Sequence, residues 1–525
     1  MNSKPEWFEA LKNPAFYPHE VDKVEVIQTH ISWVFLAGPF VYKIKKPVDF
    51  GFLDFTTLEK RHHFCLEELR LNKRLCPEIY LNVEPIVKDN NGYGLGNKNG
   101  KIIEWCVVMK RMPEQGMMQK LINQDEISEE HIDGILSKLI PFYKKAATGE
   151  GVNEYGKLEV IVQNTEENFE QTVDFKGKLI PEDTYDIIAQ YTRSFIKENQ
   201  PLFEKRIEQN FIKEGHGDLY SANICFEIND NTPTNVYIFD CIEFNKRFRC
   251  GDIASDIAFL AMDLDFHGLA DLSFYFTEKF QTEYPDPNLA KLLNFYKCYR
   301  AYVRGKIACF TWADPGIDEA TKKQLAQQAQ DYFQLAALYT GKISSPTLYI
   351  FWGLSGSGKT TLASQFAQQQ NIKFYNSDIV RKEVVAKIPV SEKHHDPFGQ
   401  GLYSPEMTEK TYKALARLAG RELAKSKSVA VDATFLDKTY RDKMIKLGKA
   451  LNAKIVFILC KTPDHIIKQR LEKRVKENQP SDGRWEIYLK QKERFEEPKK
   501  IDGAELLVID TASKPLEELI SDIQT

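Results

Sequence analysis

Apolar residues in the C-terminal third of the chain cluster in short runs, and these runs alternate with longer stretches of helical spacing. The runs are rich in β-branched and aromatic residues, which is typical of buried strands. They occupy residues 348–352, 372–378, 428–434, 454–460 and 505–510. The helical stretches occupy residues 406–425, 438–450 and 463–477. Strands that alternate with helices predict an α/β domain with a mostly parallel sheet, whose functional groups gather at the carboxyl ends of the strands.

The first two thirds of the chain follow a different pattern, in which strands come early and helices dominate later. Residues 30–47 predict two strands around an Ala-Gly-Pro turn, and residues 104–112 predict a further strand. An amphipathic helix is predicted at 57–75, and more helices from about 266 to 340. This order indicates an α+β domain ahead of the α/β domain. The expected division is residues 1–340 for the first domain, 341–346 for a linker and 347–525 for the second.

Composition is that of a soluble globular protein. The chain has 525 residues, which favours two or three domains, and 42% of them are hydrophobic. No apolar run approaches the roughly 20 residues that span a bilayer, and the N-terminus has no signal-peptide pattern. The nine cysteines form no CxxC pair, which argues for reduced thiols in a cytoplasm and against structural zinc. We therefore expect a cytoplasmic protein without a membrane partner; the sequence carries no signal for an oligomeric state.

The formal net charge of −4 is unevenly distributed along the chain. Residues 347–525 contain 31 Lys and Arg against 24 Asp and Glu, so the remainder of the chain is acidic. A basic balance is consistent with an anionic ligand on the C-terminal domain, and equally with ordinary solvated surface charge.

The stretch "GLSGSGKT" lies between the predicted strand 348–352 and a predicted helix, which is the context in which a GxxxxGK[ST] loop binds phosphate. Its small residues let backbone N–H groups turn toward phosphate oxygens. Lys359 supplies positive charge to the β- and γ-phosphates of ATP, and the Thr360 hydroxyl can ligate Mg²⁺. The residues expected to bind the nucleotide are Gly353, Ser355, Gly356, Ser357, Gly358, Lys359, Thr360 and Thr361.

Two strand ends of the same domain carry carboxylates. Asp432 ends "SVAVD" and is the expected Mg²⁺-side aspartate. Ala433 follows it where motor ATPases usually place a glutamate, which favours transfer over hydrolysis. Asp378 ends "FYNSD" and can accept a proton from an acceptor hydroxyl, and Arg381 can clamp an anionic acceptor. The alternative interpretation is a helix-capping aspartate with a surface arginine.

Residues 468–495 are rich in arginine and are interrupted by "QPSDG", which predicts a helix, a flexible break and a second helix. Arg470, Arg474 and Arg484 are candidates for a lid that folds over the phosphates and neutralises charge in the transition state. A solvated helix with Glu–Lys pairs is the alternative.

The pieces "GLSGSGKT", "SDIVR" and "VDATF", with the lid arginines, resemble the P-loop kinase group that includes polynucleotide 5′-kinase, gluconate kinase and zeta-toxin-like enzymes. The resemblance covers residues 347–525. It implies that Asp378 is the catalytic base and that Arg381 is the clamp for an acceptor phosphate, as in the DxxR pair of polynucleotide kinases.

A second group of polar residues lies in "HGDLYSANICF" at 216–226, followed by the strand-like "NVYIFD". These segments resemble the catalytic loop of the aminoglycoside phosphotransferase and choline kinase branch of the protein-kinase-like fold, where HGDxxxxN replaces HRDxxxxN. The resemblance implies that Asp218 orients or deprotonates an acceptor hydroxyl, and that Asn223 and Asp240 hold Mg²⁺. The segment between Asp240 and "CGDIASDIAFL" is short, so we expect this site to act on a small molecule.

The same resemblance implies a bilobal domain, with an N-lobe at about 1–112 and a C-lobe at about 113–340. Lys43 best matches the lysine that touches the α- and β-phosphates, and Lys45, on the same strand face, is the alternative. Glu68 is placed to pair with that lysine. The resemblance also implies structural roles for His216, as a hydrogen-bonding residue, and for Asp256, as a buried carboxylate.

Together these features resemble a family of bacterial proteins in which an aminoglycoside-phosphotransferase-like domain is fused to a P-loop ATP-binding domain. The resemblance implies two sites that use ATP and Mg²⁺ to phosphorylate acceptor hydroxyls, without identifying an aminoglycoside as the acceptor. Two other hypotheses stay open. One is a polynucleotide 5′-hydroxyl kinase in the second domain, acting on a 5′-OH nucleic acid beside a non-catalytic first domain. The other is an ATP-switched binding module without transfer chemistry.

Overall fold

The computed structural model describes residues 4–90, 92–96, 100–230, 232–389, 400–476, 484–495 and 497–524, with the side chains of 474–476 and 524 excepted. The chain forms two compact units, each built from several segments of the sequence. Unit 1 comprises Met1–Glu166, Ile196–Leu260 and Glu278–Leu293. Unit 2 comprises Glu167–Phe195, Ala261–Thr277 and Asn294–Thr525. The division at 341–346 expected from the sequence stays a prediction.

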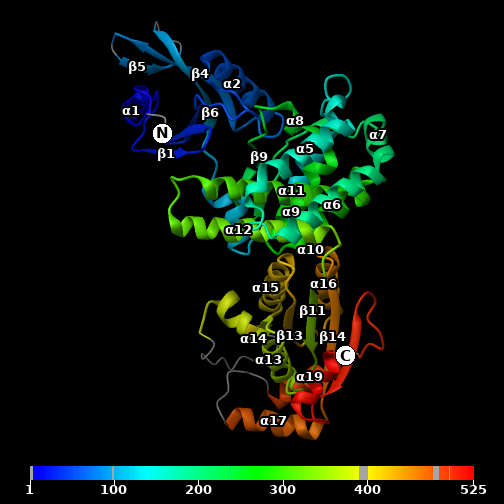
Figure 1. Ribbon diagram of the computed structural model, residues 1–525. Coiled ribbons are helices and arrows are strands. Elements are labelled where there is room, and N and C mark those ends of the chain that lie inside the picture. Colours follow the sequence, from blue (N-terminus) through cyan, green and yellow to red (C-terminus); the bar gives the residue numbers. More distant parts are fainter. Residues whose placement is uncertain are drawn as a thin grey trace. The chain divides into compact units, whose positions relative to one another are not determined.

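A six-stranded antiparallel sheet forms the first part of unit 1, drawn in blue in Figure 1. Its strand order is β1-β2-β3-β6-β4-β5. The strands are β1 (Val24–Gln28), β2 (Ser32–Ala37), β3 (Phe40–Lys45), β4 (Tyr80–Asp89), β5 (Gly92–Leu95) and β6 (Lys101–Lys110). The hairpin predicted at 30–47 is confirmed, since β2 and β3 pair with Trp33 opposite Ile44.

Helix α2 (Leu58–Asn72) packs on β4 and β6 and carries Glu68 into the interior. The Thr57 side chain accepts a backbone hydrogen bond at the N-terminus of the helix, which stabilises its first turn. The buried face of α2 is partly charged, because it includes both Arg61 and Glu68. Arg61 forms an ion pair of 2.8 Å with Glu104 of β6. Ion pairs therefore contribute to the placement of α2 on the sheet, together with apolar contacts.

Two small antiparallel sheets and several helices complete unit 1. Strand β7 pairs with β10, and β8 pairs with β9. These elements are α1 (Trp7–Leu11), α3 (Met118–Asn123), α4 (Glu129–Lys145), α7 (Gln200–Glu208), β7 (Ile212–Glu214), β8 (Ile224–Asn229), β9 (Thr232–Ile238), α8 (Lys246–Arg249) and β10 (Cys250–Asp252). Residues of both units occur in α5 (Leu158–Thr172), α6 (Glu182–Glu198), α9 (Ile253–Phe266), α10 (Ala270–Glu283) and α11 (Leu289–Ala313).

Unit 2 contains a five-stranded sheet in which every neighbouring pair is parallel, with the order β12-β13-β11-β14-β15. The predicted parallel sheet is confirmed. Its strands are β11 (Thr347–Trp352), β12 (Lys373–Asn376), β13 (Val429–Ala433), β14 (Lys454–Lys461) and β15 (Glu505–Asp510). The helices of this unit include α12 (Glu319–Tyr339), α13 (Lys359–Gln369), α15 (Pro405–Ala424), α16 (Lys438–Ala450), α17 (Asp464–Lys476), α18 (Trp485–Arg494) and α19 (Leu516–Gln524).

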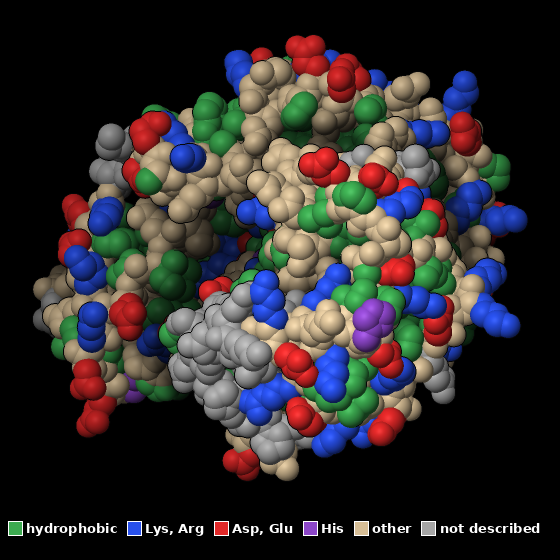
Figure 2. Space-filling view, turned by 90° about the horizontal axis from the view of Figure 1, so that it is seen from below, with side chains coloured by type: hydrophobic (Ala, Val, Ile, Leu, Met, Phe, Trp, Pro, Cys, Tyr) green, Lys and Arg blue, Asp and Glu red, His purple; other side chains and the backbone are tan. Residues whose placement is uncertain are grey.

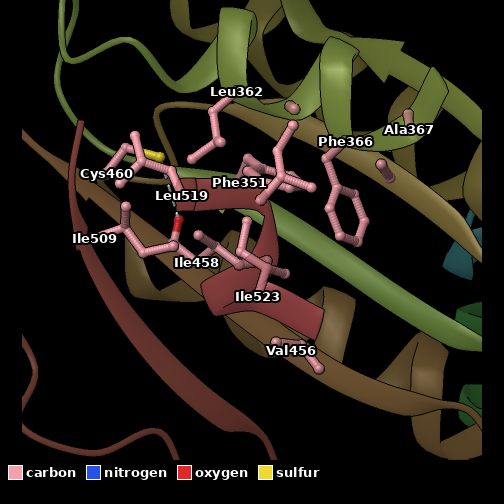
Figure 3. Packing of buried hydrophobic residues seen from close by; sticks show 13 residues of the cluster. Phe351, Leu362, Phe366, Ala367, Val456, Ile458, Cys460, Ile509, Leu519 and Ile523 are labelled. Carbon is pink, nitrogen blue, oxygen red and sulfur yellow. Dashed lines mark hydrogen bonds between the residues drawn. The ribbon is translucent and has the colours of Figure 1, made fainter. Parts of the chain in front are cut away.

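Helices cover both faces of the parallel sheet. On one face, Phe351 and Ile458 point from the strands toward Phe366 of α13 and Leu519 of α19, as Figure 3 shows. On the other face, helices α15 and α16 pack on the strands. Burial on both faces explains why the strands are continuous apolar runs instead of alternating patterns. The carboxyl ends of β11, β12 and β13 then lie at one edge, which is where the polar residues gather.

The segment after β12 departs from the predicted strand 372–378. The strand ends at Asn376, and a short helix, α14 (Ser377–Ile379), begins at once. The Asn376 side chain accepts hydrogen bonds from the N–H groups of Asp378 and Ile379 at 3.0 and 3.1 Å, which ends the strand and caps the helix. A π-helical turn over Val380–Ala386 follows.

Two expectations from composition concern thiols and membranes. All nine cysteines are free and buried. They pack as small apolar side chains, for example Cys65, Cys76 and Cys225 in one core cluster of unit 1. In the described part of the chain, no helix has the length and apolar character needed to cross a bilayer.

Candidate active sites

The loop between β11 and α13 has a backbone conformation that glycine adopts readily. Gly353, Gly356 and Gly358 have φ angles of 139°, 80° and 83°. Space is also restricted, because a Cβ atom on Gly358 would lie 2.6 Å from the Thr511 hydroxyl. Helix α13 begins at Lys359, directly after the loop, and the N-terminus of a helix stabilises an anion. The loop therefore has the conformation that the "GLSGSGKT" motif predicts.

Side chains from two other segments hold this loop by its carbonyl groups. The Ser357 carbonyl accepts hydrogen bonds from the hydroxyls of Thr511 and Thr462, at 2.6 and 3.1 Å. Arg470 of α17 donates to the Thr511 hydroxyl at 3.1 Å and to the Gly356 carbonyl at 3.4 Å. These bonds use carbonyl oxygens of the loop and occupy none of its N–H groups, although the Ser357 N–H donates to the Leu354 carbonyl at 3.2 Å. Thr462 and Thr511 were not identified from the sequence, which places no recognisable motif around either residue.

The predicted lid residues lie on two helices near the loop. Arg470 contacts the loop directly, and Arg484 lies half-buried at the start of α18. The side chain of Arg474 falls outside the described residues. Helix α18 also touches the loop, since the Ser355 N–H donates to Gln491 Oε1 at 2.9 Å. The lid function of the three arginines stays a prediction.

Asp432 lies at the end of β13, is fully buried, and shares one oxygen with two donors. Its Oδ2 accepts hydrogen bonds from the Thr360 hydroxyl at 2.5 Å and from the Asn376 amide at 2.7 Å. Its Oδ1 is buried without a hydrogen-bond partner in the described structure. Burial raises the pKa of Asp432, while the nearby Lys359 ammonium opposes that shift. A buried orphan carboxylate oxygen beside a threonine hydroxyl is a donor set that fits Mg²⁺. Asn376 was missed from the sequence; its place at a strand end was the only available signal.

Asp378 and Arg381 have different surroundings in the structure. Asp378 is half-buried in the first turn of α14. Arg381 is only 6% exposed, donates to the Leu402 carbonyl at 2.9 Å, and lies 4.8 Å from the Tyr403 ring centre. Within the described residues, no ion pair joins Arg381 to Asp378. Arg381 thus anchors the 402–403 segment, and the roles of both residues in catalysis stay predictions.

In unit 1, Asp218, Asn223 and Asp240 converge. The Asn223 amide donates to the Asp218 carboxylate and to the Asp218 carbonyl, both at 2.9 Å. The Phe239 N–H donates to the Asn223 carbonyl at 3.0 Å, which brings Asp240 beside this pair. Asp240 has a φ angle of 63°, a strained conformation for a residue other than glycine, and such strain is frequent at functional sites. Because Asn223 donates through Nδ2, its Oδ1 is the atom that suits a hard cation, as does the Asp240 carboxylate.

His216 and Asp256 hold the backbone of this loop. Asp256 accepts hydrogen bonds from the N–H groups of His216 and Gly217, at 2.8 and 3.0 Å. The Asp218 N–H donates to His216 Nδ1 at 3.2 Å, so Nε2 carries the ring proton and donates to the Phe239 carbonyl at 3.0 Å. Burial lowers the pKa of His216 to about 4, so the ring is neutral at pH 7. Both contacts fit the structural roles expected for these residues.

Lys43 and Lys45 of β3 both contact Glu68 of α2. Lys43 Nζ lies 2.9 Å from Glu68 and 2.6 Å from Asp240, and Lys45 Nζ lies 2.7 Å from the other Glu68 oxygen. Lys45 also pairs with Glu243. Burial opposes the charge on Lys43, but the carboxylates of Asp240 and Glu68 outweigh it and raise its pKa. Burial raises the pKa of Glu243, and Lys45 offsets part of that shift. Glu243 was not identified from the sequence, where only its spacing of three from Asp240 marks it.

Two depressions of about 380 and 430 Å³ lie along the outer side of α2. Their lining includes Glu59 and His63 of the helix, and in the second case Trp105 of β6. Neither contains a residue predicted to bind nucleotide or acceptor, so we assign them no part in the two sites.

The chain is similar to known proteins in two ranges. Residues 348–498 match a family model described as an AAA domain. Over 448 residues, the chain is 28% identical to "Uncharacterized protein Rv2004c" of Mycobacterium tuberculosis, which covers 85% of this chain and 86% of that protein. The same values apply to "Uncharacterized protein Mb2027c" of Mycobacterium bovis.

Solved structures are similar to shares of the chain, at low sequence identity. An amicoumacin kinase, hAmiN, in complex with AMP-PNP, Ca²⁺ and Ami, is 14% identical, with a TM-score of 0.38, and covers 63% of this chain and 93% of that one. A gluconokinase from Sinorhizobium meliloti is 19% identical, with a TM-score of 0.23, and covers 34% of this chain and 89% of that one. The family match is the more specific finding, because the segment it covers, from β11 to α18, carries the whole phosphate-binding loop.

Proposed function

We propose that this protein is an ATP-dependent phosphotransferase with two separate sites, one in each unit, and that each site transfers the γ-phosphoryl group to an acceptor hydroxyl. One observation carries the proposal: each unit by itself brings a lysine close to a carboxylate, Lys43 to Asp240 in unit 1 and Lys359 to Asp432 in unit 2. Neither site needs a residue from the other unit. The AAA-domain match of residues 348–498 supports nucleotide binding in unit 2.

In unit 2, the N-terminus of α13, the N–H groups of loop 353–358 other than those of Ser355 and Ser357, and the Lys359 ammonium bind the phosphates and stabilise the charge that develops during transfer. Asp378, in α14 directly after β12, takes the proton from the acceptor hydroxyl. The fully buried Asp432 and the Thr360 hydroxyl hold the cation. Hydrolysis is disfavoured because Ala433, and not a glutamate, follows Asp432.

In unit 1, Lys43 binds phosphate oxygens and Asp218 accepts the proton of the acceptor hydroxyl. Asn223 orients the Asp218 carboxylate through its 2.9 Å hydrogen bond. Mg²⁺, held by Asn223 and Asp240, would neutralise phosphate charge when bound. Only the short helix α8 and strand β10 separate Asp240 from α9, and so short a segment supports a small-molecule acceptor.

A polynucleotide 5′-kinase is the alternative for unit 2, and no specific contact among the described residues favours it. Arg381, the expected clamp for an acceptor phosphate, is buried against Leu402. Among the described residues, basic and acidic side chains are interspersed on the face drawn in Figure 2. Lys454, for example, pairs with Glu505 at 2.9 Å. A surface that tracks a nucleic acid backbone normally presents clustered positive charge.

The test is a transfer assay with γ-labelled ATP and a panel of sugars, aminoglycosides, nucleosides and 5′-OH oligonucleotides. The wild-type protein is compared with Asp218→Ala and with Asp378→Ala. We expect label on a small alcohol that is lost only with Asp218→Ala, and label on a second acceptor that is lost only with Asp378→Ala.

Other results of this assay separate the alternatives. Label on oligonucleotides alone, lost only with Asp378→Ala, identifies a polynucleotide kinase. Nucleotide binding without transfer to any acceptor identifies an ATP-switched binding module and refutes the proposal. Loss of both activities in either variant also refutes it, because the two sites would then not be separate.

A further inference from the structure

Five charged side chains of unit 1 form one continuous chain of alternating sign. Its order is Asp240, Lys43, Glu68, Lys45 and Glu243, and each neighbouring pair is in ion-pair contact. Lys43 and Lys45 are two residues apart on β3, so their side chains project from the same face of the strand. Glu68 lies between them and gives one carboxylate oxygen to each lysine. Both ends of the chain, Asp240 and Glu243, belong to one short segment.

The two ends of this chain differ sharply in exposure. The side chains of Lys43 and Asp240 are 16% and 44% exposed. Those of Lys45 and Glu243 are 1% and 5% exposed, and Glu68 is fully buried. The open end can exchange its partners for ligands, whereas the closed end is shielded from solvent and from any ligand. A buried charge left without its partner costs several kcal/mol, so the closed pair stays intact.

Further contacts fix the closed end in the protein. Lys45 Nζ lies 4.9 Å from the centre of the Phe55 ring, which lines its pocket. The Glu243 carbonyl accepts a hydrogen bond of 3.0 Å from Arg249, a buried residue. The pair therefore joins three elements: strand β3, helix α2 through Glu68, and the segment that carries Asp240.

We propose that Lys45 and Glu243 are positioning residues for the unit 1 site. They hold Glu68, and with it α2, and the 240–243 segment in register with β3 while Lys43 and Asp240 release each other and turn to the nucleotide and its cation. Lys45 does not touch the phosphates; Lys43 does. This inference rests on the proposed function of unit 1, and it assigns the two lysines, which sequence spacing cannot distinguish, to different tasks.

The experiment uses the full-length protein in a Lys359→Met background, so that any remaining transfer comes from unit 1. The main variant is Lys45→Met/Glu243→Gln, which removes both charges of the closed pair together, while Glu68 loses Lys45 and keeps its ion pair with Lys43. Lys46→Met is the matched control, because this neighbouring lysine contacts the Thr29 carbonyl and not the ion-pair chain. The measurements are ATP affinity, kcat for unit 1, and amide hydrogen exchange of α2 with and without Mg-ATP.

We expect the double variant to bind ATP within about threefold of the background, with kcat lower by about ten- to a hundredfold, as for groups that orient direct ligands elsewhere. Exchange in α2 should become faster and should no longer be slowed by Mg-ATP. Lys46→Met should leave all three measurements unchanged. Unchanged kcat and exchange in the double variant would overturn the proposal, and so would a loss of ATP affinity with kcat retained.

Two further measurements cover the cases in which the double variant does not fold or unit 1 transfers no phosphate. Should the double variant not fold, Glu243→Asp keeps the charge but shortens the side chain by one methylene; a lower kcat supports the proposal and an unchanged kcat refutes it. Should the wild-type unit 1 transfer no phosphate, the proposed function fails, yet the hydrogen exchange of α2 still reports whether Lys45 and Glu243 hold the helix when nucleotide binds.

Discussion

The two candidate sites are built from different parts of the polypeptide. In unit 2, the phosphate-binding loop takes its shape from the backbone, through three glycines with positive φ angles and one helix N-terminus. In unit 1, the site is assembled from side chains of separate segments, such as Lys43 and Asp240, which are 197 residues apart. A backbone site tolerates changes in neighbouring side chains but not in its glycines. A side-chain site depends on buried ion pairs and hydrogen bonds, so a change in one partner disturbs the others.

The largest expected effect is the loss of the Lys359 charge in unit 2. Lys359→Met should lower transfer by unit 2 about a hundred- to a thousandfold, because it removes one preorganised electrostatic contact to the phosphates. Transfer by unit 1 should not change. The assay measures both activities with their own acceptors, and Lys373→Met, at an exposed position on β12, is the control. A parallel fall in both activities would contradict the separation of the two sites.

Gly358→Ala tests whether the backbone φ angles determine the conformation of loop 353–358. The added Cβ would lie 2.6 Å from the Thr511 hydroxyl, and the φ angle of 83° is unfavourable for alanine. Strain of about 1–3 kcal/mol corresponds to roughly ten- to a hundredfold weaker nucleotide binding in unit 2. Gly341→Ala is the matched control, since Gly341 also has positive φ, at 63°, but has open space around it. Equal effects of both variants in a titration with ATP would refute the close-contact argument.

Asp256→Asn tests the side-chain construction of unit 1. An asparagine side chain has one oxygen and can replace only one of the two acceptors that the N–H groups of His216 and Gly217 use. The other buried N–H group loses its acceptor, which costs about 1–3 kcal/mol. We expect kcat of unit 1 to fall about tenfold as Asp218 loses its orientation, with unit 2 unaffected. Kinetic measurement with the unit 1 acceptor checks this, and Asp22→Asn, at an exposed position, serves as the control. Wild-type kcat would show that the catalytic loop does not need Asp256.

The smallest expected effect is on the thermal stability of unit 2, and it comes from the buried carboxyl group of Asp432. Burial raises its pKa, so the folded state binds this proton more tightly than the unfolded state does, and stability falls as pH rises from the unfolded pKa through the raised folded pKa. Asp432→Asn removes this cost. We expect Tm of unit 2 to rise by about 2–4 °C at pH 8 and to stay unchanged at low pH, where Asp432 is protonated. Calorimetry at the two pH values checks this, and a lower Tm at pH 8 would contradict it.

Most of the unit 2 loop and its flanking strands could be predicted from the sequence. The strand predicted at 454–460 is β14 (Lys454–Lys461), and the strand predicted at 505–510 is β15 (Glu505–Asp510). The period of the apolar residues, the spacing of the glycines and the flanking apolar runs are local features, so they can be recognised without knowing the fold. Prediction was less successful at residues 377–379, where the Asn376 side chain caps a helix and ends the strand early.

The partners of individual side chains could not be predicted in the same way. Sequence spacing placed Lys43 and Lys45 on one face of β3 but gave no means of telling them apart. It contained no sign that Glu243 pairs with Lys45, 198 residues away, or that Arg381 points to Leu402. Such pairs depend on how distant segments close on each other, and that depends on the packing of the entire unit.

The sequence by itself determined where the strands of the parallel sheet lie, which loop carries the phosphate-binding motif, and which acidic residues follow those strands, because each of these depends on a few adjacent residues. Only the tertiary structure decided which lysine is partly exposed and which is fully buried, and which carboxylate oxygen is left without a donor. Exposure and hydrogen-bond partners are properties of contacts between remote segments, and no local pattern of residues specifies them.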